Sequence, residues 1–193
     1  MTYTPLKPKL KEQRLVCSGM NWQQFKSIQQ GFTDYRGIRL FYYKGEVEIL
    51  AVSPEHETVR ETLAVLLGIY FAEKQIECVP TGAFTQEKEG EASAQADISY
   101  FIGRRPAQGE NSIPDLSIEV VITSGGVNKL NRYFVLGVPE VWFWEDGLFS
   151  LYHLRKSGYE KIEQSELLAD LDLELLSRCM MMGSFIDAIS RWA

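Results

Sequence analysis

The sequence has few of the residues that build disulfide frameworks and metal clusters. Its 193 residues include only three cysteines and two histidines. Cys17, Cys78 and Cys179 are odd in number, widely spaced and set in apolar surroundings, which predicts neither a disulfide framework nor a zinc site. Such cysteines favour a reducing compartment, so we expect the protein to be cytoplasmic.

Long apolar runs and an excess of basic residues are also missing. No signal-peptide core and no run of membrane-spanning length is present, so no membrane is expected as a partner. A net charge of −6 argues against a strongly basic nucleic-acid coat, although a locally basic cleft is compatible with it. Helix-turn-helix signatures, zinc fingers, repeats and low-complexity segments are absent from the sequence. These absences leave an ordinary globular protein.

One domain is the default for a chain of this length. Residues 1–20 contain scattered basic residues and two prolines, and we interpret them as an arm or an outer strand. Contact of this arm with nucleic acid is the alternative. Residues 21–193 are predicted to form a single domain, because no linker composition separates a second one.

The first third of the chain contains clear helix and hairpin signals. Asn21 is a predicted N-cap of a short helix that ends at Gly31, and strands are expected at 38–43 and 46–52. Ser53 is the predicted cap of the longest helix, which runs through Lys74 with a proline in its first turn.

Acidic residues alternate with apolar ones in the second of these strands. Glu46 and Glu48 are therefore expected to face solvent or the mouth of a cleft.

The rest of the chain alternates between strand and helix patterns. Strands are predicted at 76–79, 83–86, 94–102, 113–123, 138–144, 148–154 and 159–162, and helices at 127–136 and after Ser184. Strands separated by a helix of this length form a crossover unit with parallel strands. The order helix, three strands, helix, strand predicts an α/β core with an antiparallel N-terminal addition.

The stretch 113–123, IPDLSIEVVIT, is an apolar run with an acid, Glu119, in its middle. A buried carboxylate must be paired, bind a metal or become neutral. Asp97 lies in the preceding predicted strand, and acids on one face of adjacent strands can share Mg²⁺. Asp115 competes with Asp97 for this role, but its place after Pro114 also suits a turn. A hydrogen-bonded pair of acids, or acids on opposite faces, are the alternatives to a metal site.

A cation near such a metal can position the attacking water or stabilise a phosphorane. Lys129, near the start of the next helix, is the best candidate, because the residue two after Glu119 is Val121. His56 falls on the inward stripe of the long helix, where a core histidine bonded to backbone is the common case. Glu57 and Glu61 flank that stripe, where most glutamates are solvated.

Four motifs together resemble the Uma-two family of endonucleases within the PD-(D/E)XK superfamily. They are SPEH at 53–56, AQADIS at 94–99, PDLSIEVV at 114–121 and K-x-x-x-Y-x-x-x-GVPEVW at 129–142. The resemblance covers roughly residues 20–180. It implies a restriction-endonuclease-like fold, in which a helix, three strands, a second helix and a fourth strand form a core with a mixed sheet.

The resemblance also implies roles for individual residues. Asp97 and Glu119 are the acids of the second and third strands and would hold Mg²⁺, for which Mn²⁺ can substitute. The lysine that usually follows the second acid has moved to Lys129, and Tyr133 matches the family's tyrosine. The first helix usually adds an acid or a histidine, which His56, Glu57 or Glu61 could supply. The implied activity is Mg²⁺-dependent hydrolysis of DNA phosphodiester bonds.

This sequence departs from the family at two places, which keeps a second function open. The segment 122–128, ITSGGVN, lacks the usual serine-proline turn and aspartate, and Ala96 replaces the proline before the first acid. The alternative is therefore an inactive nuclease-fold module for nucleic acid or protein binding. Phosphate contacts are expected from four basic residues: Lys129, Arg104, Arg105 and Arg132.

A homodimer is expected from one further feature. The aromatic strand Val141–Trp144 and Phe149 look exposed in the sequence pattern, and pairing or packing between subunits would cover them.

Overall fold

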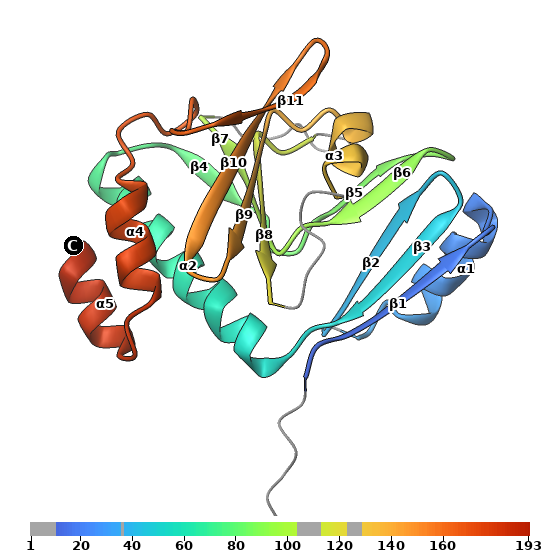
Figure 1. The fold of residues 1–193 in the computed structure, drawn as a ribbon, viewed down its shortest axis with the longest axis horizontal. Helices are drawn as coiled ribbons and strands as arrows, with labels where there is room; N and C mark the ends of the chain where they lie inside the picture. Colours follow the sequence, from blue (N-terminus) through green and yellow to red (C-terminus); the bar gives the residue numbers. More distant parts are fainter. Residues whose placement is uncertain (1–10, 36, 104–112, 123–128) are drawn as a thin grey trace, which may run out of the picture.

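The computed structural model describes residues 11–35, 37–103, 113–122 and 129–193, which form two sheets and five helices (Figure 1). The elements in chain order are β1 (Gln13–Ser18), α1 (Trp22–Gly31), β2 (Ile38–Tyr43), β3 (Glu46–Ala51), α2 (Pro54–Glu73), β4 (Cys78–Pro80), β5 (Thr85–Lys88), β6 (Ala92–Gln95), β7 (Ile98–Ile102), β8 (Leu116–Val121), α3 (Leu130–Leu136), β9 (Glu140–Glu145), β10 (Leu148–Arg155), β11 (Gly158–Ile162), α4 (Leu173–Met180) and α5 (Phe185–Trp192).

The two sheets have different topologies. Sheet A has the order β1-β3-β2-β6-β5, and its strands are antiparallel. Sheet B has the order β11-β10-β9-β8-β7-β4. Its strands β8 and β9 are parallel to each other, and α3 connects them in the sequence. The series α2, β4, β7, β8, α3, β9 is the predicted helix, three strands, helix and strand. The predicted α/β core with a mixed sheet and an antiparallel N-terminal addition is confirmed.

Local capping explains where the helices begin. Asn21 and Gln24 form a reciprocal capping box at α1, and the Ser53 side chain accepts from the His56 backbone N–H at α2. Ser184 caps α5 in the same way. Gly137 ends α3 with φ of +80°, a left-handed conformation that glycine adopts at little cost. These signals are local, which is why the sequence pattern reveals them.

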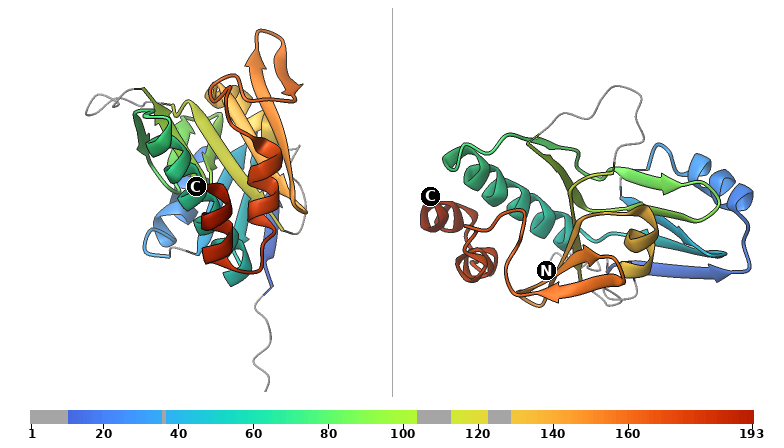
Figure 2. Two further views of the ribbon diagram at one scale, coloured as in Figure 1. Left: turned by 90° about the vertical axis from the view of Figure 1, so that its left-hand side faces the viewer. Right: turned by 90° about the horizontal axis from the view of Figure 1, so that it is seen from above.

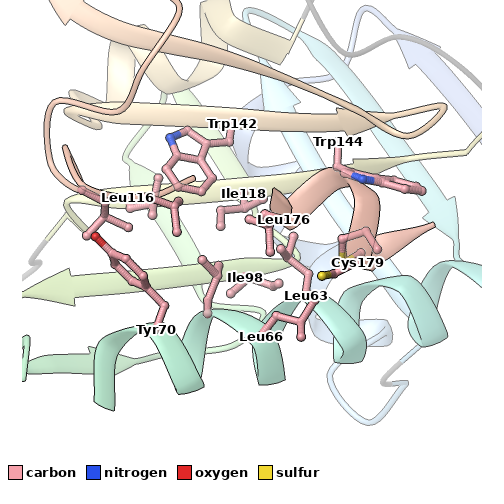
Figure 3. Close-up of a cluster of buried hydrophobic side chains, with 14 of the residues drawn as sticks. Leu63, Leu66, Tyr70, Ile98, Leu116, Ile118, Trp142, Trp144, Leu176 and Cys179 are labelled. Atoms are coloured by element: carbon pink, nitrogen blue, oxygen red, sulfur yellow. The ribbon is translucent and has the colours of Figure 1, made fainter. Parts of the chain in front are cut away.

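One face of sheet B packs on three helices. Figures 1 and 2 show α4 and α5 beside α2 at one end of the molecule. Side chains of α2, such as Leu63 and Leu66, meet Ile98, Ile118 and Trp142 from the sheet (Figure 3). This cluster is the largest apolar core of the protein, and it fixes α2 against the sheet.

The opposite face of sheet B packs on α3 and on sheet A. Val121, Val141 and Phe143 from sheet B join Phe41 of β2 and Tyr133 of α3 in a second cluster. All six residues of β8 are buried as a result, so the strand is covered on both faces as predicted. The side chains of β8 that point this way lie between the two sheets.

One predicted strand is in fact two. The expected strand at 94–102 breaks at Ala96 and Asp97, where the chain leaves sheet A at the end of β6 and enters sheet B as β7. The alternation of side chains does not show this break, because both halves are extended and buried. Asp97 therefore lies at the junction of the two sheets.

The aromatic strand does not support the expected dimer. Val141, Trp142, Phe143 and Trp144 are all buried within the chain, so the interpretation of this strand as an exposed association surface is wrong. The apolar faces of β9 are covered by α2 on one side and by sheet A with α3 on the other.

The N-terminal segment, the cysteines and the helix lengths were also subjects of the sequence analysis. Residues 13–18, within the predicted arm, form the edge strand β1 on β3, while the division at residue 20 stays a prediction. The three cysteines are free. None of the helices in the described ranges combines the length and apolar character needed to cross a membrane.

Truncation of the main core should be costly. Leu66 has no exposed surface, so we expect Leu66→Ala to lower the free energy of unfolding by about 2–5 kcal/mol through lost burial and a cavity. Leu148→Ala is the matched control, because Leu148 is 71% exposed and should change stability by less than about 0.5 kcal/mol. Urea denaturation measures both. Equal losses would contradict the packing described for α2.

Candidate active site

Asp97 connects three elements at the junction of the sheets. Its Oδ2 accepts a hydrogen bond of 2.9 Å from the backbone N–H of Val120 in β8. Its Oδ1 lies 2.9 Å from His56 Nε2 of α2 and accepts a 3.3 Å hydrogen bond from Arg39 Nε of β2. Burial alone would raise the pKa of Asp97, but His56, Lys129 and Val120 outweigh it and hold this pKa below its usual value. Asp97 is therefore an ionised, buried carboxylate.

Glu119 is buried in the middle of β8, with 1% of its surface exposed. Its Oε2 accepts a 2.7 Å hydrogen bond from Lys129 Nζ, and its Oε1 accepts one from the Tyr133 hydroxyl. Both partners come from the first turns of α3. Burial and the nearby charge of Asp97 raise the pKa of Glu119, and Lys129 opposes this rise in part.

The strand register brings the two acids together. Ile98 of β7 pairs with Ile118 of β8, and Ser99 pairs with Ser117. Continued one residue beyond the start of β7, this register sets Asp97 opposite Glu119, and opposite residues of an antiparallel pair project to the same face. That face is the one between sheet B, sheet A and α3.

Lys129 completes the group predicted from the sequence. It is 4% exposed, and its Nζ lies 4.9 Å from the centre of the Phe41 ring as well as beside Glu119. Burial lowers the pKa of Lys129, but the charges of Glu119, Asp97 and Glu48 outweigh it and raise this pKa. Lys129 is therefore a cation at neutral pH.

The His56 ring contacts two carboxylates and is not the core histidine bonded to backbone that its helix position suggested. Its Nδ1 lies 2.9 Å from Glu12 Oε1, and its Nε2 faces Asp97. Burial would lower the pKa of His56, but the two carboxylates outweigh it and raise the pKa to about 9. The ring is thus a buried imidazolium between two acids.

The other first-helix candidates lie further out. Glu57 accepts hydrogen bonds of 2.9 Å from Arg39 Nη2 and 2.8 Å from Arg60 Nε, and it is about one-third exposed. Glu61 is exposed and pairs with Arg60. Of the three candidates, His56 contacts Asp97 directly, Glu57 reaches Asp97 through Arg39, and Glu61 lies outside this set of contacts.

Sequence reasoning missed a third buried acid. Glu48 has 1% of its surface exposed, so the expectation that it faces solvent or a cleft mouth is wrong. Its Oε1 accepts a 2.8 Å hydrogen bond from Arg14 Nε, and its Oε2 accepts one from Arg132 Nη2. Burial raises its pKa, but Arg132, Arg14 and Lys129 outweigh it and lower this pKa. A basic residue in β1 and another in α3 were the available signal, but only the fold brings them together.

Asp115, the rival of Asp97 in the sequence pattern, has a different set of contacts. Asp115 Oδ2 accepts a 2.8 Å hydrogen bond from the backbone N–H of Ile102, which ties the start of β8 to the end of β7. Arg104 and Arg105, expected to contact phosphate, lie outside the described residues.

Asp97 and Glu119 fit Mg²⁺ by the type of their donors. Mg²⁺ takes hard oxygen ligands, commonly one or two carboxylates with waters and phosphate oxygens. Glu119 accepts one protein hydrogen bond on each oxygen, and Asp97 Oδ2 also accepts one, so each carboxylate keeps a free lone pair. Across the described ranges, no three His, Cys, Asp or Glu side chains form a metal-binding cluster. A two-carboxylate site is therefore the metal site that these residues can supply.

Comparison with known proteins agrees with the motifs. The model of the Uma2 family, described as "Putative restriction endonuclease", matches residues 22–180. A solved structure, described as a "putative nuclease belonging to DUF820 from Anabaena variabilis ATCC 29413", shares 15% sequence identity. The likeness covers 80% of this chain and 91% of that one, with a TM-score of 0.44. No match was found among curated proteins.

The imidazolium of His56 predicts a pH-dependent contribution to stability. Its pKa is about 9 in the folded protein against 6.5 for an ordinary histidine, so the contribution is complete below pH 6.5 and is lost as the pH rises through 9. In urea denaturation with EDTA, the advantage of wild type over His56→Gln should fall across this window, by at most ~1.4 kcal/mol per pH unit. Parallel pH curves for the two proteins would contradict the buried imidazolium.

Proposed function

The chain belongs to the Uma2 family and has its restriction-endonuclease-like fold, and we propose that it is a Mg²⁺-dependent endonuclease that hydrolyses DNA phosphodiester bonds. The single observation that carries this proposal is the contact of 2.7 Å between Lys129 Nζ and Glu119, with Asp97, just before β7, bonded to the next residue of the same strand, Val120. Two acids and a cation at one point are the side chains that a metal-assisted phosphodiester hydrolysis requires.

Asp97 and Glu119 would hold the metal, with Mn²⁺ as a possible substitute for Mg²⁺. Such a metal lowers the pKa of a bound water and neutralises charge on the phosphoryl group. Because Lys129 is a buried cation with a raised pKa, its role is to orient the attacking water and stabilise negative charge, and it is a poor general base.

The surrounding residues hold these three groups in position. Tyr133 donates to Oε1 of Glu119, and His56 and Arg39 contact Oδ1 of Asp97. Glu57 acts one step further away, through Arg39. A network of this kind restricts the carboxylates to one geometry, which is what a metal site needs.

The cellular setting is a separate part of the proposal. The free cysteines support a reducing cytoplasm as the location. A homodimer stays a prediction. The aromatic strand that suggested it is buried, and Phe149, the other residue behind it, is half-buried against the main core.

An inactive nuclease-fold module that binds nucleic acid is the second candidate. It is favoured by the ion pairs of the buried acids. Asp97 is paired with His56 and Arg39, and Glu119 is paired with Lys129. Carboxylates with protein partners of opposite charge are stable without a metal.

The nuclease proposal predicts that supercoiled plasmid is nicked with Mg²⁺ or Mn²⁺. Asp97→Asn, Glu119→Gln and Lys129→Gln should each lower the rate by about 10²-fold or more, because each removes a charge that acts on the reacting phosphate. Glu174→Gln is the control, since Glu174 is an exposed acid of α4. Equal nicking by all of these proteins would assign the activity to a contaminant or another site.

Metal binding separates the two candidates. Calorimetry with Mn²⁺ should give binding to wild type and to Lys129→Gln, and loss of that binding in Asp97→Asn and Glu119→Gln, because carboxylates are the ligands and the lysine is not. Absence of binding to wild type at millimolar Mn²⁺ would favour the inactive module.

A further inference from the structure

Arg132 has a feature that the contacts of the active site leave unexplained. Its guanidinium is 5% exposed, and Nη2 donates to Glu48. Its Nη1 is buried and has no hydrogen-bond partner in the part of the chain that the structure describes. A buried donor without an acceptor costs about 1–3 kcal/mol, and more when the group is charged. Such a group calls for an acceptor, and the described residues do not supply one.

The position of Arg132 connects it to the reacting centre. Its Cζ lies 4.8 Å from the centre of the Phe41 ring, and Lys129 Nζ lies 4.9 Å from the same point. Lys129 and Arg132 are three residues apart at the start of α3, so both project from one side of that helix. The unpartnered nitrogen is therefore in the same buried region as the Lys129–Glu119 pair.

Glu48 keeps the guanidinium in place without neutralising the region. A single carboxylate contacts both Arg14 and Arg132, and the charge of Lys129 also acts on it. Because Lys129 is already paired with Glu119, two arginines share the single charge of Glu48, which leaves one positive charge uncompensated in this contact. An anion is the ligand that such a region favours.

From these observations, and given the nuclease function proposed above, we propose that Arg132 is a phosphate-binding residue of the active site. Its Nη1 donates to a non-bridging oxygen of a phosphodiester, while Nη2 stays on Glu48. Arginine suits this role because its planar fork of donors matches phosphate geometry. Glu48 and Arg14 are positioning residues, which fix the fork and touch no substrate.

Binding measurements in EDTA test this proposal independently of cleavage. A fluorescein-labelled DNA duplex is titrated with each protein over a series of NaCl concentrations. Arg132→Gln should weaken binding about tenfold and reduce the slope of log K against log [NaCl] by about 1, because one phosphate contact is lost. Arg178→Gln is the matched control, since it removes the same charge from an exposed position on α4 and should leave the affinity and the slope unchanged.

A second variant separates binding from folding. Arg132→Gln alone leaves Glu48 buried with one fewer partner and could unfold the chain. The double variant Arg132→Gln, Glu48→Gln removes both charges, and its fold is checked by circular dichroism. It should show the same loss of affinity and of salt slope. A folded double variant that binds duplex like wild type would overturn the proposal.

Inorganic phosphate distinguishes the source of the ligand. If wild type binds no duplex, but phosphate raises its melting temperature and not that of the double variant, the site stands with free phosphate as its ligand and the DNA function fails. If neither duplex nor phosphate acts through Arg132, the phosphate site is wrong. Metal-dependent nicking by Arg132→Gln at the wild-type rate would then leave the nuclease function intact, so the two failures are distinguishable.

Discussion

The buried carboxylate of Asp97 makes the contacts that join the two sheets and the long helix α2. It lies where the chain leaves sheet A and enters sheet B, and it contacts β8 through Val120 N–H, α2 through His56 and β2 through Arg39. Three elements from distant parts of the sequence are therefore fixed by one side chain. Since the contacts are buried and charge-assisted, each is stronger than a neutral hydrogen bond at the surface. The same contacts hold Asp97 next to Glu119, so the geometry of the fold and the geometry of the site have a common origin.

The sequence predicts the local elements and the burial of Asp97 and Glu119, because those signals are local. The Ser53 cap and the buried run around Glu119 need only neighbouring residues to be recognised. Lys129 was identified by its spacing in a family motif, and its Nζ donates a hydrogen bond to Glu119 in the structure. Glu48 could not be identified in this way. Alternation along a strand tells which residues share a face, but whether another layer covers that face depends on how distant elements pack.

The break between β6 and β7 shows the same limit from another side. Residues 92–102 are buried except for Gln95 and Ile102, which are half-buried, so no change of burial marks the point where one sheet ends. Only the identity of the strand partners differs, with β2 and β5 on one side and β4 and β8 on the other. Pairing of this kind is long-range information. Asp97, the acid at the break, can nevertheless be singled out in the sequence, because a charged residue in an apolar run requires an explanation.

Two buried groups of the candidate site have partners in or next to β1, the exposed edge strand of sheet A. Glu12, just before this strand, contacts His56, and Arg14 within it contacts Glu48. The strand lies at the sheet edge, pairs with β3 alone and is largely exposed. Edge segments with few buried contacts open at a lower free energy than the core. Each brief opening of β1 would remove one partner from the imidazolium and one from the Glu48 carboxylate. The charge state of the buried centre is thus linked to fluctuations of an outer strand, on a timescale that amide hydrogen exchange can resolve.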